Sequence, residues 1–483
     1  MNQVVKDIPL LDLMSFLIET PDTPAHVGGL QIFQPVNGSA LECINRMLEG
    51  FRKAPVGAPF CYQPEFPAFG WPKWTVSDTF DFDYHIRRAG LPSPGTQAQL
   101  LERVMDLHAG IMDRSRPGWI AYLIEGLEQD RFAVYWKIHH AYIDGESAIM
   151  RLERFLADTP EDLNVQPIWG PLEGDPSQDT TGESQARRSS LRSESTLKSI
   201  GTQAIAWRDV GLALGRNLLQ AGGVLRREAP VPFSAPPSLF NQPVHATRHL
   251  GVASVALDRF KRLSRVQAVS INELALALVG EALERYVSQC DTLPDRPFIA
   301  TCPMSIRAPG DTEASTQIAA ISVKLGKPGS DLLSRVQQVH ASSVDAKAEA
   351  RRLSREALVN YLILVGGTAD LLSKTALGPS LPPLTSVNVS NVVGPKRRCY
   401  LAGAELIRSY PVSTLAGGTA INITFNSFSD RMDYAVVSDA KAVPGAQQIA
   451  DEILLALEKM EALLFDPENS TRYPSEPAER AEA

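Results

Sequence analysis

The sequence predicts an α/β protein built from two lobes, and three observations support this. The chain has 483 residues, which exceeds the size of one typical domain. In both halves, runs with the character of strands are interspersed with apolar residues at helical spacing. Between the halves, residues 174–184 contain almost no apolar side chains, which is typical of a linker.

The first half predicts strands and helices up to residue 157. Alternating or β-branched runs predict the strands, and apolar residues three and four apart predict the helices. The strand at 119–124 is expected to pair with the strand that leads to the histidine pair. The predicted elements are a helical turn at 9–20, a strand from about 29 to 33, a helix at 41–51, strands at 80–88 and 119–124, a strand at 131–136 that ends at the histidines, and a helix at 147–157.

A polar linker at 171–196 and a proline-rich stretch at 230–243 enclose one helix, residues 197–227. Its charges are mostly basic, and Ile200, Trp207, Val210, Leu214 and Leu218 follow one side, which suits a helix at a membrane surface. The alternative is a crossover helix packed on the protein. Both interpretations stay open from the sequence.

The second half repeats the pattern of strands and helices and ends in a tail predicted to be disordered. The predicted elements are strands at 249–257, 296–303, 420–428 and 432–438, a strand and turn at 386–395, helices at 270–288 and 445–464, and a helical region at 331–374. We therefore divide the chain into an N-terminal lobe, residues 1–170; a linker and crossover helix, 171–245; a C-terminal lobe, 246–465; and the tail, 466–483.

Composition excludes several classes of protein. A hydrophobic content of 44% and a charged content of 21% are those of a globular protein with a large core. The net charge of −8 gives no overall electrostatic reason to bind nucleic acid. The cysteines are five, scattered and without paired spacing, which favours reduced thiols in the cytoplasm.

Membrane contact is expected to be peripheral. The N-terminus lacks a basic region followed by an apolar run, so no signal peptide is expected. No uninterrupted apolar run is long enough to span a bilayer. A lipid substrate would therefore be met at a membrane surface.

The pair His139-His140 is the strongest chemical signal, because it lies where a strand ends and a helix begins. Neighbouring residues of a strand point to opposite faces, so only one of the two can aim into a given cavity. A neutral imidazole can take a proton from a hydroxyl and return it to a leaving group. Asp144 directly precedes the helix, and we favour an N-cap role for it over proton transfer.

Zinc binding is the competing interpretation, since His139, His140 and Asp144 are all of ligand types. The opposed directions of the two histidines argue against it. No HExxH motif and no paired CxxC spacing occurs in the sequence. A serine hydrolase is also disfavoured, because the sequence lacks the G-x-S-x-G nucleophile elbow.

The motif His139-His140-x-x-x-Asp144-Gly145 resembles the active site of the CoA-dependent acyltransferase and condensation-domain superfamily. Further stretches resemble the bacterial wax ester synthase/diacylglycerol acyltransferase family within it. They are Glu19-Thr20 before His26-Val27-Gly28-Gly29, and residues 80–88, 112–117, 270–273, 303–307 and 388–395. Such coverage of the chain is not produced by chance motifs. The resemblance implies two chloramphenicol-acetyltransferase-like lobes with mixed sheets and an active-site tunnel between them.

The resemblance also implies site residues. The catalytic group comprises His140 as general base, with His139, Asp144, Gly145 and Asn272. An oxyanion donor is expected from Asn272 or from a backbone N–H near Gly145, although Asn272 could instead cap a helix. The family more often has Asp where this chain has Glu273. The expected substrate-binding residues are Glu19, Ser305, Arg307, Asn388 and Asn391; for Glu19 a solvated or capping acid is the alternative.

The implied activity is O-acyl transfer from long-chain acyl-CoA to a fatty alcohol or diacylglycerol, by direct transfer in a ternary complex. No metal or resident cofactor is expected; acyl-CoA is a co-substrate, and its phosphates would meet Lys396-Arg397-Arg398 or Arg351-Arg352. The expected location is cytoplasmic, at the inner membrane surface or lipid inclusions. The alternatives are a condensation-type enzyme with a carrier-bound donor, or a non-catalytic lipid-binding relative.

Overall fold

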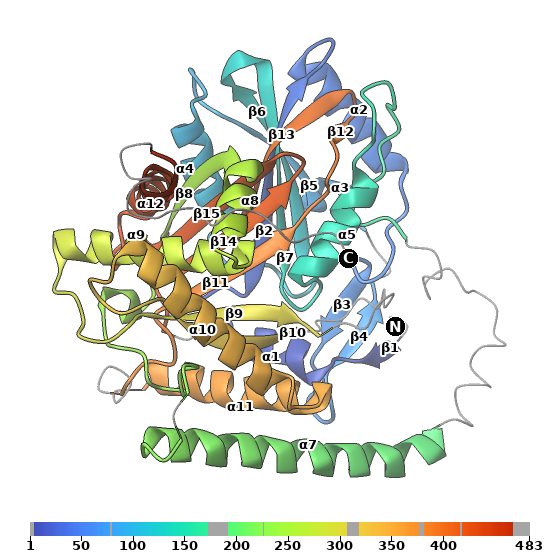
Figure 1. Cartoon of the computed structure of the whole chain (residues 1–483). Helices are drawn as coiled ribbons and strands as arrows, with labels where there is room; N and C mark the ends of the chain where they lie inside the picture. Colours follow the sequence, from blue (N-terminus) through green and yellow to red (C-terminus); the bar gives the residue numbers. More distant parts are fainter. Residues whose placement is uncertain are drawn as a thin grey trace, which may run out of the picture.

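The computed structural model describes residues 4–77, 80–171, 192–225, 227–306, 318–375, 381–415 and 418–466. Within these ranges the strands form two six-stranded mixed sheets and a small three-stranded sheet, with helices packed around them (Figure 1). This confirms the predicted α/β class and its two lobes. Most of the predicted linker and nearly all of the predicted tail lie outside the described residues, as does Arg307.

The first sheet has the strand order β12-β13-β2-β7-β6-β5. The predicted pairing of the strand at 119–124 with the strand that carries the histidines is confirmed, because β6 and β7 are antiparallel neighbours. Helices α2 (Ala40–Lys53) and α4 (Gln97–His108) each begin at a capping box, with Ser39 and Thr96 as the N-caps. The strands are β2 (His26–Pro35), β5 (Ile86–Gly90), β6 (Trp119–Leu127), β7 (Arg131–His139), β12 (Tyr400–Leu401) and β13 (Ala404–Val412).

The second sheet has the order β10-β9-β11-β14-β15-β8, and its central strand β11 is parallel to both neighbours. The strands are β8 (Arg248–Ala256), β9 (Ile299–Ser305), β10 (Ile318–Lys324), β11 (Val387–Val393), β14 (Ile421–Phe428) and β15 (Arg431–Asp439). The helices of this lobe include α8 (Leu257–Val266), α9 (Ile271–Cys290), α10 (Leu332–Ala350) and α12 (Ala446–Phe465).

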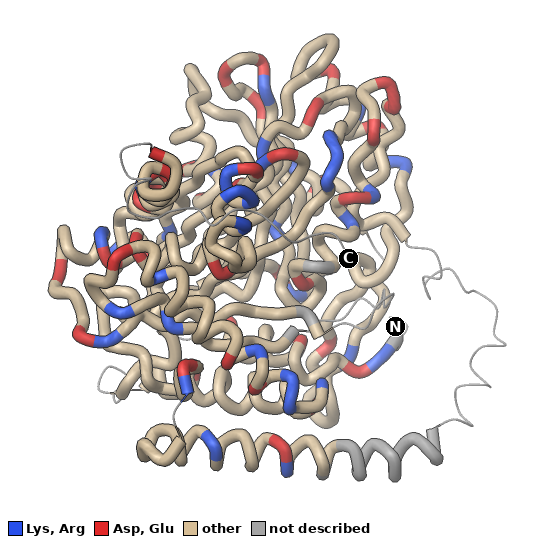
Figure 2. Tube along the Cα trace, in the orientation of Figure 1, with Lys and Arg blue, Asp and Glu red and all other residues tan. Residues whose placement is uncertain are grey.

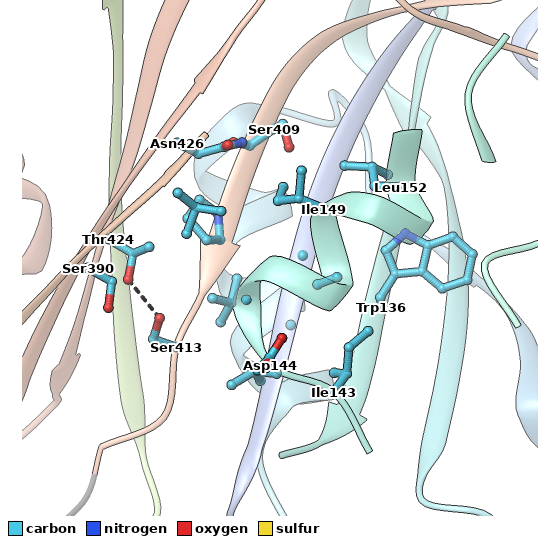
Figure 3. A pocket seen from close by; sticks show the side chains of 18 of the residues that line it. Trp136, Ile143, Asp144, Ile149, Leu152, Ser390, Ser409, Ser413, Thr424 and Asn426 are labelled. Carbon is cyan, nitrogen blue, oxygen red and sulfur yellow. Dashed lines mark hydrogen bonds between the residues drawn. The ribbon is translucent and has the colours of Figure 1, made fainter. Parts of the chain in front are cut away.

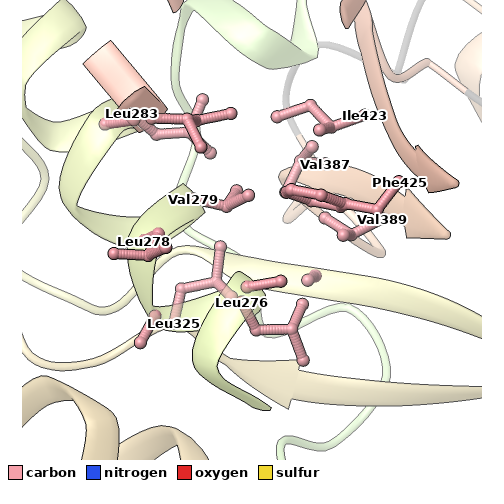
Figure 4. Packing of buried hydrophobic residues seen from close by; sticks show 14 of the residues in the cluster. Leu276, Leu278, Val279, Leu283, Leu325, Val387, Val389, Ile423 and Phe425 are labelled. Carbon is pink, nitrogen blue, oxygen red and sulfur yellow. The ribbon is translucent and has the colours of Figure 1, made fainter. Parts of the chain in front are cut away.

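The core of the second lobe lies between helix α9 and the second sheet. Leu276, Val279 and Leu283 of α9 are fully buried and belong to one cluster with apolar side chains of β11 and β14 (Figure 4). Along β14, Ile423 and Phe425 point into this cluster, so the residues between them point to the opposite face. That opposite face carries Asn422, Thr424 and Asn426, and it is directed towards β13.

Strand β13 joins the two lobes. It follows β11 in the chain, yet it pairs along β2 of the first sheet, with Ala404 opposite Pro35 and Val412 opposite Gly28. A third core cluster contains side chains from both sheets, and Tyr410 and Val412 of β13 lie within it. The first sheet therefore contains residues from both ends of the sequence, whereas the predicted lobes were consecutive segments.

Helices α1, α7 and α11 lie at one end of the molecule (Figure 1). Helix α11 (Arg355–Ser373) contacts both α1 (Leu10–Ile18) and α7 (Arg192–Ala221). The small sheet has the order β1-β4-β3 and consists of β1 (Val4–Asp7), β3 (Tyr62–Glu65) and β4 (Lys73–Val76). Among the described residues no single helix meets the length and hydropathy of a membrane span, although the bent pair α8–α9 does so by length and composition.

One predicted element was partly wrong, and several elements were missed, among them α4, α8 and β10. Residues 82–85 of the predicted strand form a helical turn, α3 (Phe82–His85), because the Asp81 side chain accepts from the Tyr84 N–H. The predicted helical region at 331–374 is confirmed and consists of two helices, α10 and α11, since Ser354 caps the second start. Strand β13 was missed because Pro411 and a bulge after Leu406 break its alternation.

Candidate functional site

A cavity of about 590 Å³ lies between the two sheets. Its first side comes from β2, β7 and helix α5 (Gly145–Phe155), which follows the histidine pair. Its second side comes from β11, β13 and β14 (Figure 3). His140, Asp144 and Gly145 of the predicted motif all line this cavity. The cavity is therefore the candidate active site.

The two histidines have different surroundings, as the alternation of the strand predicts. His139 ends β7 opposite His26 of β2 and is fully buried, away from the cavity lining. His140 is half-buried and lines the cavity, and its N–H donates to the Ala25 carbonyl. The chain then turns sharply, because the Tyr142 N–H donates to the His139 carbonyl at 2.9 Å.

His139 is held in a fixed orientation. Its Nδ1 accepts from the Ala141 N–H at 3.2 Å, which places the ring proton on Nε2. The ring stacks on Phe16 of α1 at 4.1 Å between centroids, and Nε2 lies 3.8 Å from Glu19 Oε1. Burial, with His140 and Arg114 nearby, lowers the pKa of His139 to about 3. His139 is therefore neutral near pH 7 and belongs to the framework of the turn.

The environment of His140 suits a base. Burial lowers its pKa below the ordinary value of 6.5, and the carboxylate of Asp144 only partly opposes this. The imidazole is therefore neutral near pH 7, the form that can accept a proton.

Asp144 is the N-cap of α5, because its Oδ1 accepts from the Ser147 N–H at 2.8 Å. This confirms the predicted capping role. Gly145 follows as the first helical residue, and a Cβ atom placed on it would stand 3.8 Å from Val392 of β11. The helix thus begins beside the second lobe, and the first N–H groups of a helix have no partner within it.

Glu19 lies behind His139, outside the cavity lining. Its Oε1 accepts from the Ala25 N–H at 3.0 Å, and its Oε2 pairs with Arg114 at 3.0 Å. The Arg114 guanidinium also lies over the Phe16 ring and donates to the Phe16 carbonyl. Glu19 therefore holds the segment under His139 in place; the predicted contact with substrate stays a prediction.

The other predicted residues are separated by the structure. Asn391 lines the cavity, whereas Asn388 of the same strand does not. Ser305 ends β9, beside Pro303 and Met304 of the lining. Asn272 is absent from the lining residues, and the alternative that it caps a helix was wrong, because Ser270 is the N-cap of α9.

Glu273 completes the capping box of α9 with Ser270. It also binds Lys347 at 2.8 Å and His340 at 3.0 Å. Despite burial, these contacts lower the pKa of Glu273 to about 2. Although the family more often has Asp at this position, the carboxylate of Glu273 is fully paired in this chain.

Of the predicted phosphate contacts, Arg397 is already engaged, since it pairs with Asp158 and donates to carbonyls at the end of α5. Arg352 pairs with Glu349. Lys396 and Arg398 are exposed and follow Val393, a residue of the cavity lining.

Sequence reasoning missed several polar residues of the lining. The only sequence signal is a polar residue at every second position of β14, at Asn422, Thr424 and Asn426. No pattern in the neighbouring sequence predicts that these three side chains lie close to β2 or β13. The missed residues are Gln31, Ser390, Ser409, Ser413, Thr424 and Asn426.

Comparisons with known proteins identify the family of this chain. Residues 9–275 match the model of the wax ester synthase/diacylglycerol acyltransferase catalytic domain, and residues 315–461 match the C-terminal domain of the same family. A probable diacylglycerol O-acyltransferase of Mycobacterium tuberculosis is 32% identical over 454 residues, 93% of this chain and 97% of that protein. The O-acyltransferase WSD of Acinetobacter baylyi is 29% identical over 463 residues, 95% of this chain and 98% of that protein.

Solved structures show the same fold. The wax ester synthase/diacylglycerol acyltransferase from Marinobacter aquaeolei VT8 has a TM-score of 0.73 and 26% identity, covering 95% of this chain and 99% of its own. The starter condensation domain of rhizomide synthetase has a TM-score of 0.59 at 12% identity, covering 96% of this chain and 94% of its own. The second likeness concerns the fold alone.

Proposed function

Because this chain belongs to the wax ester synthase/diacylglycerol acyltransferase family and is an O-acyltransferase, we propose that it transfers a long-chain acyl group from acyl-CoA to a fatty alcohol or diacylglycerol. The observation that carries the proposal is His140, a neutral imidazole on the wall of a cavity between the lobes. His140 is the general base, and the acceptor hydroxyl lies against it. The apolar side chains of α5 face the acyl chain.

The reaction is one displacement at the thioester carbonyl. His140 takes the hydroxyl proton as the acceptor oxygen attacks, and a tetrahedral oxyanion forms. Collapse breaks the carbon–sulfur bond and releases the CoA thiolate, which receives the proton back from His140. Holding both reactants in one cavity makes their encounter effectively intramolecular, which contributes several kcal/mol, on the order of 7–11 at best.

The oxyanion is stabilised by the backbone N–H of Gly145. It belongs to the first turn of α5, where N–H groups are unpaired within the helix and the helix dipole favours negative charge. Gly145 lines the cavity, whereas Asn272 does not. This supports the backbone donor over the side-chain donor.

Transfer is direct, without an acyl-enzyme. Cys302, the cysteine nearest in sequence to the lining, is buried in the core of the second lobe, and burial raises the pKa of its thiol to about 12. A thiol with this pKa is not a nucleophile near pH 7. Intact-protein mass spectrometry after incubation with acyl-CoA alone should show an unmodified mass; an adduct discharged by alcohol would contradict direct transfer.

Product analysis tests the function itself. The full-length protein, given one long-chain acyl-CoA with a fatty alcohol and a diacylglycerol in competition, should form wax ester, triacylglycerol or both. Free CoA should appear in equal amount. Ester formation from a carrier-bound donor alone would favour the condensation-type alternative, and absence of ester from every donor would contradict the proposal.

We also propose that the molecule works at a lipid surface, which its α7 face contacts. Val210 of α7 is buried against α11, and Leu214 packs beside it. Ile205, Leu212 and Leu219 recur every seven residues on the opposite side of the helix, and each is about half exposed. Helix α7 thus has apolar residues on both faces, and its described part carries few charges (Figure 2).

The same end of the molecule exposes further large apolar side chains. They are Leu364 and Leu371 on α11, Leu10 and Leu17 on α1, and Phe66, Phe69 and Trp71 between β3 and β4. Exposed large apolar side chains are typical of an interaction site when they lie in one patch. Two of the basic side chains of this segment are paired, Arg208 with Asp209 and Arg227 with Glu349.

The double variant Leu212→Glu/Leu219→Glu is expected to lose most of its flotation with liposomes, because two charges would enter the apolar contact. Leu41→Glu, at an exposed leucine of α2 at the other end of the molecule, is the matched control and should float like the wild type. Flotation by the double variant equal to that of the wild type would contradict the α7 face. Dimers that dissociate only in the double variant would assign the face to a second copy instead.

A further inference from the structure

The backbone of His140 is held by one short segment of the first lobe, residues 22–25, which leads into β2. The His140 N–H donates to the Ala25 carbonyl at 2.9 Å. The Ala25 N–H donates in turn to Glu19 Oε1 at 3.0 Å. Both backbone polar groups of Ala25 are therefore bound beside the histidine pair, and the position of Ala25 determines where the His140 backbone lies.

The second half of the chain holds two other carbonyls of this segment. Thr414, two residues after the end of β13, donates its hydroxyl to the Pro24 carbonyl at 2.8 Å. Arg248, the first residue of β8, donates to the Asp22 carbonyl. The partners of these two bonds are 390 and 226 positions apart in the chain. The segment that holds His140 is thus itself held by the second half of the chain.

The geometry of the peptide group makes these contacts bear on the base. The Pro24 C=O and the Ala25 N–H belong to one planar peptide group. Thr414 binds the oxygen of that group and Glu19 binds its N–H, so the two side chains fix the plane at both edges. The next carbonyl along the chain is the one that accepts from the His140 N–H. A rotation of the plane would therefore displace the acceptor that fixes the His140 backbone.

Thr414 and Arg248 are themselves anchored in the second half of the chain. The Thr414 carbonyl accepts from Asn422 Nδ2 of β14 at 3.2 Å. The Arg248 side chain is buried, and its guanidinium lies 3.7 Å from the carboxylate of Asp439, which ends β15. Neither Thr414 nor Arg248 belongs to the cavity lining. Their effect on the site must therefore pass through residues 22–25.

We propose that Thr414 and Arg248 are positioning residues for His140, and that they act by holding residues 22–25. The half of the chain that supplies the far side of the cavity thereby aligns the base on the near side. The base is fully aligned only when the two lobes are in contact. This inference rests on the proposed role of His140 in acyl transfer and adds the residues that set its position.

The test begins with Thr414→Val, which removes the hydroxyl and keeps the shape of the side chain. The full-length protein, with saturating palmitoyl-CoA and fatty alcohol, should lose about tenfold in kcat, between the loss of one hydrogen bond and the hundredfold cost of a 1 Å misplacement. The KM values should stay the same, because Thr414 lies outside the lining. Thr414→Ser keeps the donor and should recover most of the rate. Arg248→Lys keeps a cation beside Asp439 without the fork that also reaches Asp22, and should show a smaller loss of the same kind.

Dependence on His140 separates positioning from a general structural effect. In a His140→Ala background, Thr414→Val should leave the residual rate unchanged, because no base remains to be misplaced. Thr385→Val is the matched control, since the Thr385 hydroxyl is buried in the second lobe, donates to the Ile299 carbonyl at 2.9 Å and lies outside the lining. It should keep the wild-type kcat.

Two results would overturn the proposal. One is a wild-type kcat in Thr414→Val, and the other is a loss of the same size when Thr414→Val is added to His140→Ala. A wild type that forms no ester from palmitoyl-CoA would instead contradict the proposed function.

Discussion

Replacing His140 with alanine should lower kcat by about 10²–10⁴-fold, the usual contribution of a general base. His140 lines the cavity beside Asp144 and Gly145, and no other histidine does so among the described residues. Single-turnover rates with saturating acyl-CoA and alcohol would measure the loss. Because the half-buried ring is not part of a core cluster, thermal unfolding should change little.

The pH dependence gives a second readout of the same residue. The base acts in its neutral form, and burial lowers the pKa of His140 below 6.5. The wild-type rate should therefore stay constant as pH falls to 6.5 and decline only below it. In His140→Ala this acidic limb should disappear.

His139→Ala is the matched comparison, because it removes the neighbouring imidazole from the opposite face of the strand. That variant loses the stack on Phe16 and the acceptor for the Ala141 N–H, so its main effect should be on stability. A catalytic loss larger than that of His140→Ala would reverse the assignment of the two histidines.

Replacing Arg335 with methionine should lower the free energy of unfolding by about 3–5 kcal/mol, the scale for removing one partner of a buried ion pair. Arg335 is almost fully buried and forms two bonds to Glu284, at 2.9 and 2.7 Å. Its Nη1 also donates to the Leu325 carbonyl at 2.9 Å. Without the guanidinium, the Glu284 carboxylate would be buried with no cation beside it.

Urea unfolding monitored by fluorescence would measure the change, with the slope against urea held constant between variants. The double variant Arg335→Met/Glu284→Gln removes both charges and should recover part of the loss. Glu281, which lies 3.6 Å from Arg335, keeps Lys459 as its partner at 2.8 Å. A loss below about 1 kcal/mol in the single variant would show that the pair is not a major stabilising contact.

Local signals in the sequence were sufficient to predict the side of the active site that carries His140. The strand, turn and N-cap around His140 depend on residues within ten positions of one another, and the alternation of the strand separated the two histidines correctly. The capping role of Asp144 also follows from its place before a helix. Such features can be predicted because short-range geometry determines them.

The opposite side could not be predicted, because it depends on pairing between distant segments. The contact of Gln31 with Ser409 joins residues 378 positions apart, and β13 carries a proline and a bulge that hide its alternation. Asn272 shows the converse: a family motif supplied a residue, yet the structure does not bring it to the cavity. Motif resemblance identified the family better than it identified the lining.

Strand β13 has a consequence for synthesis of the chain. In the complete molecule, β2 lies between β7 and β13. When β7 has left the ribosome, about 270 residues must still be added before β13 is complete, which takes roughly 15–55 s at ~5–20 residues per second. During that time one edge of β2 has no partner from its own sheet, and unpaired edges recruit other strands. The nascent chain should therefore depend on a chaperone that covers this edge until the C-terminal half arrives.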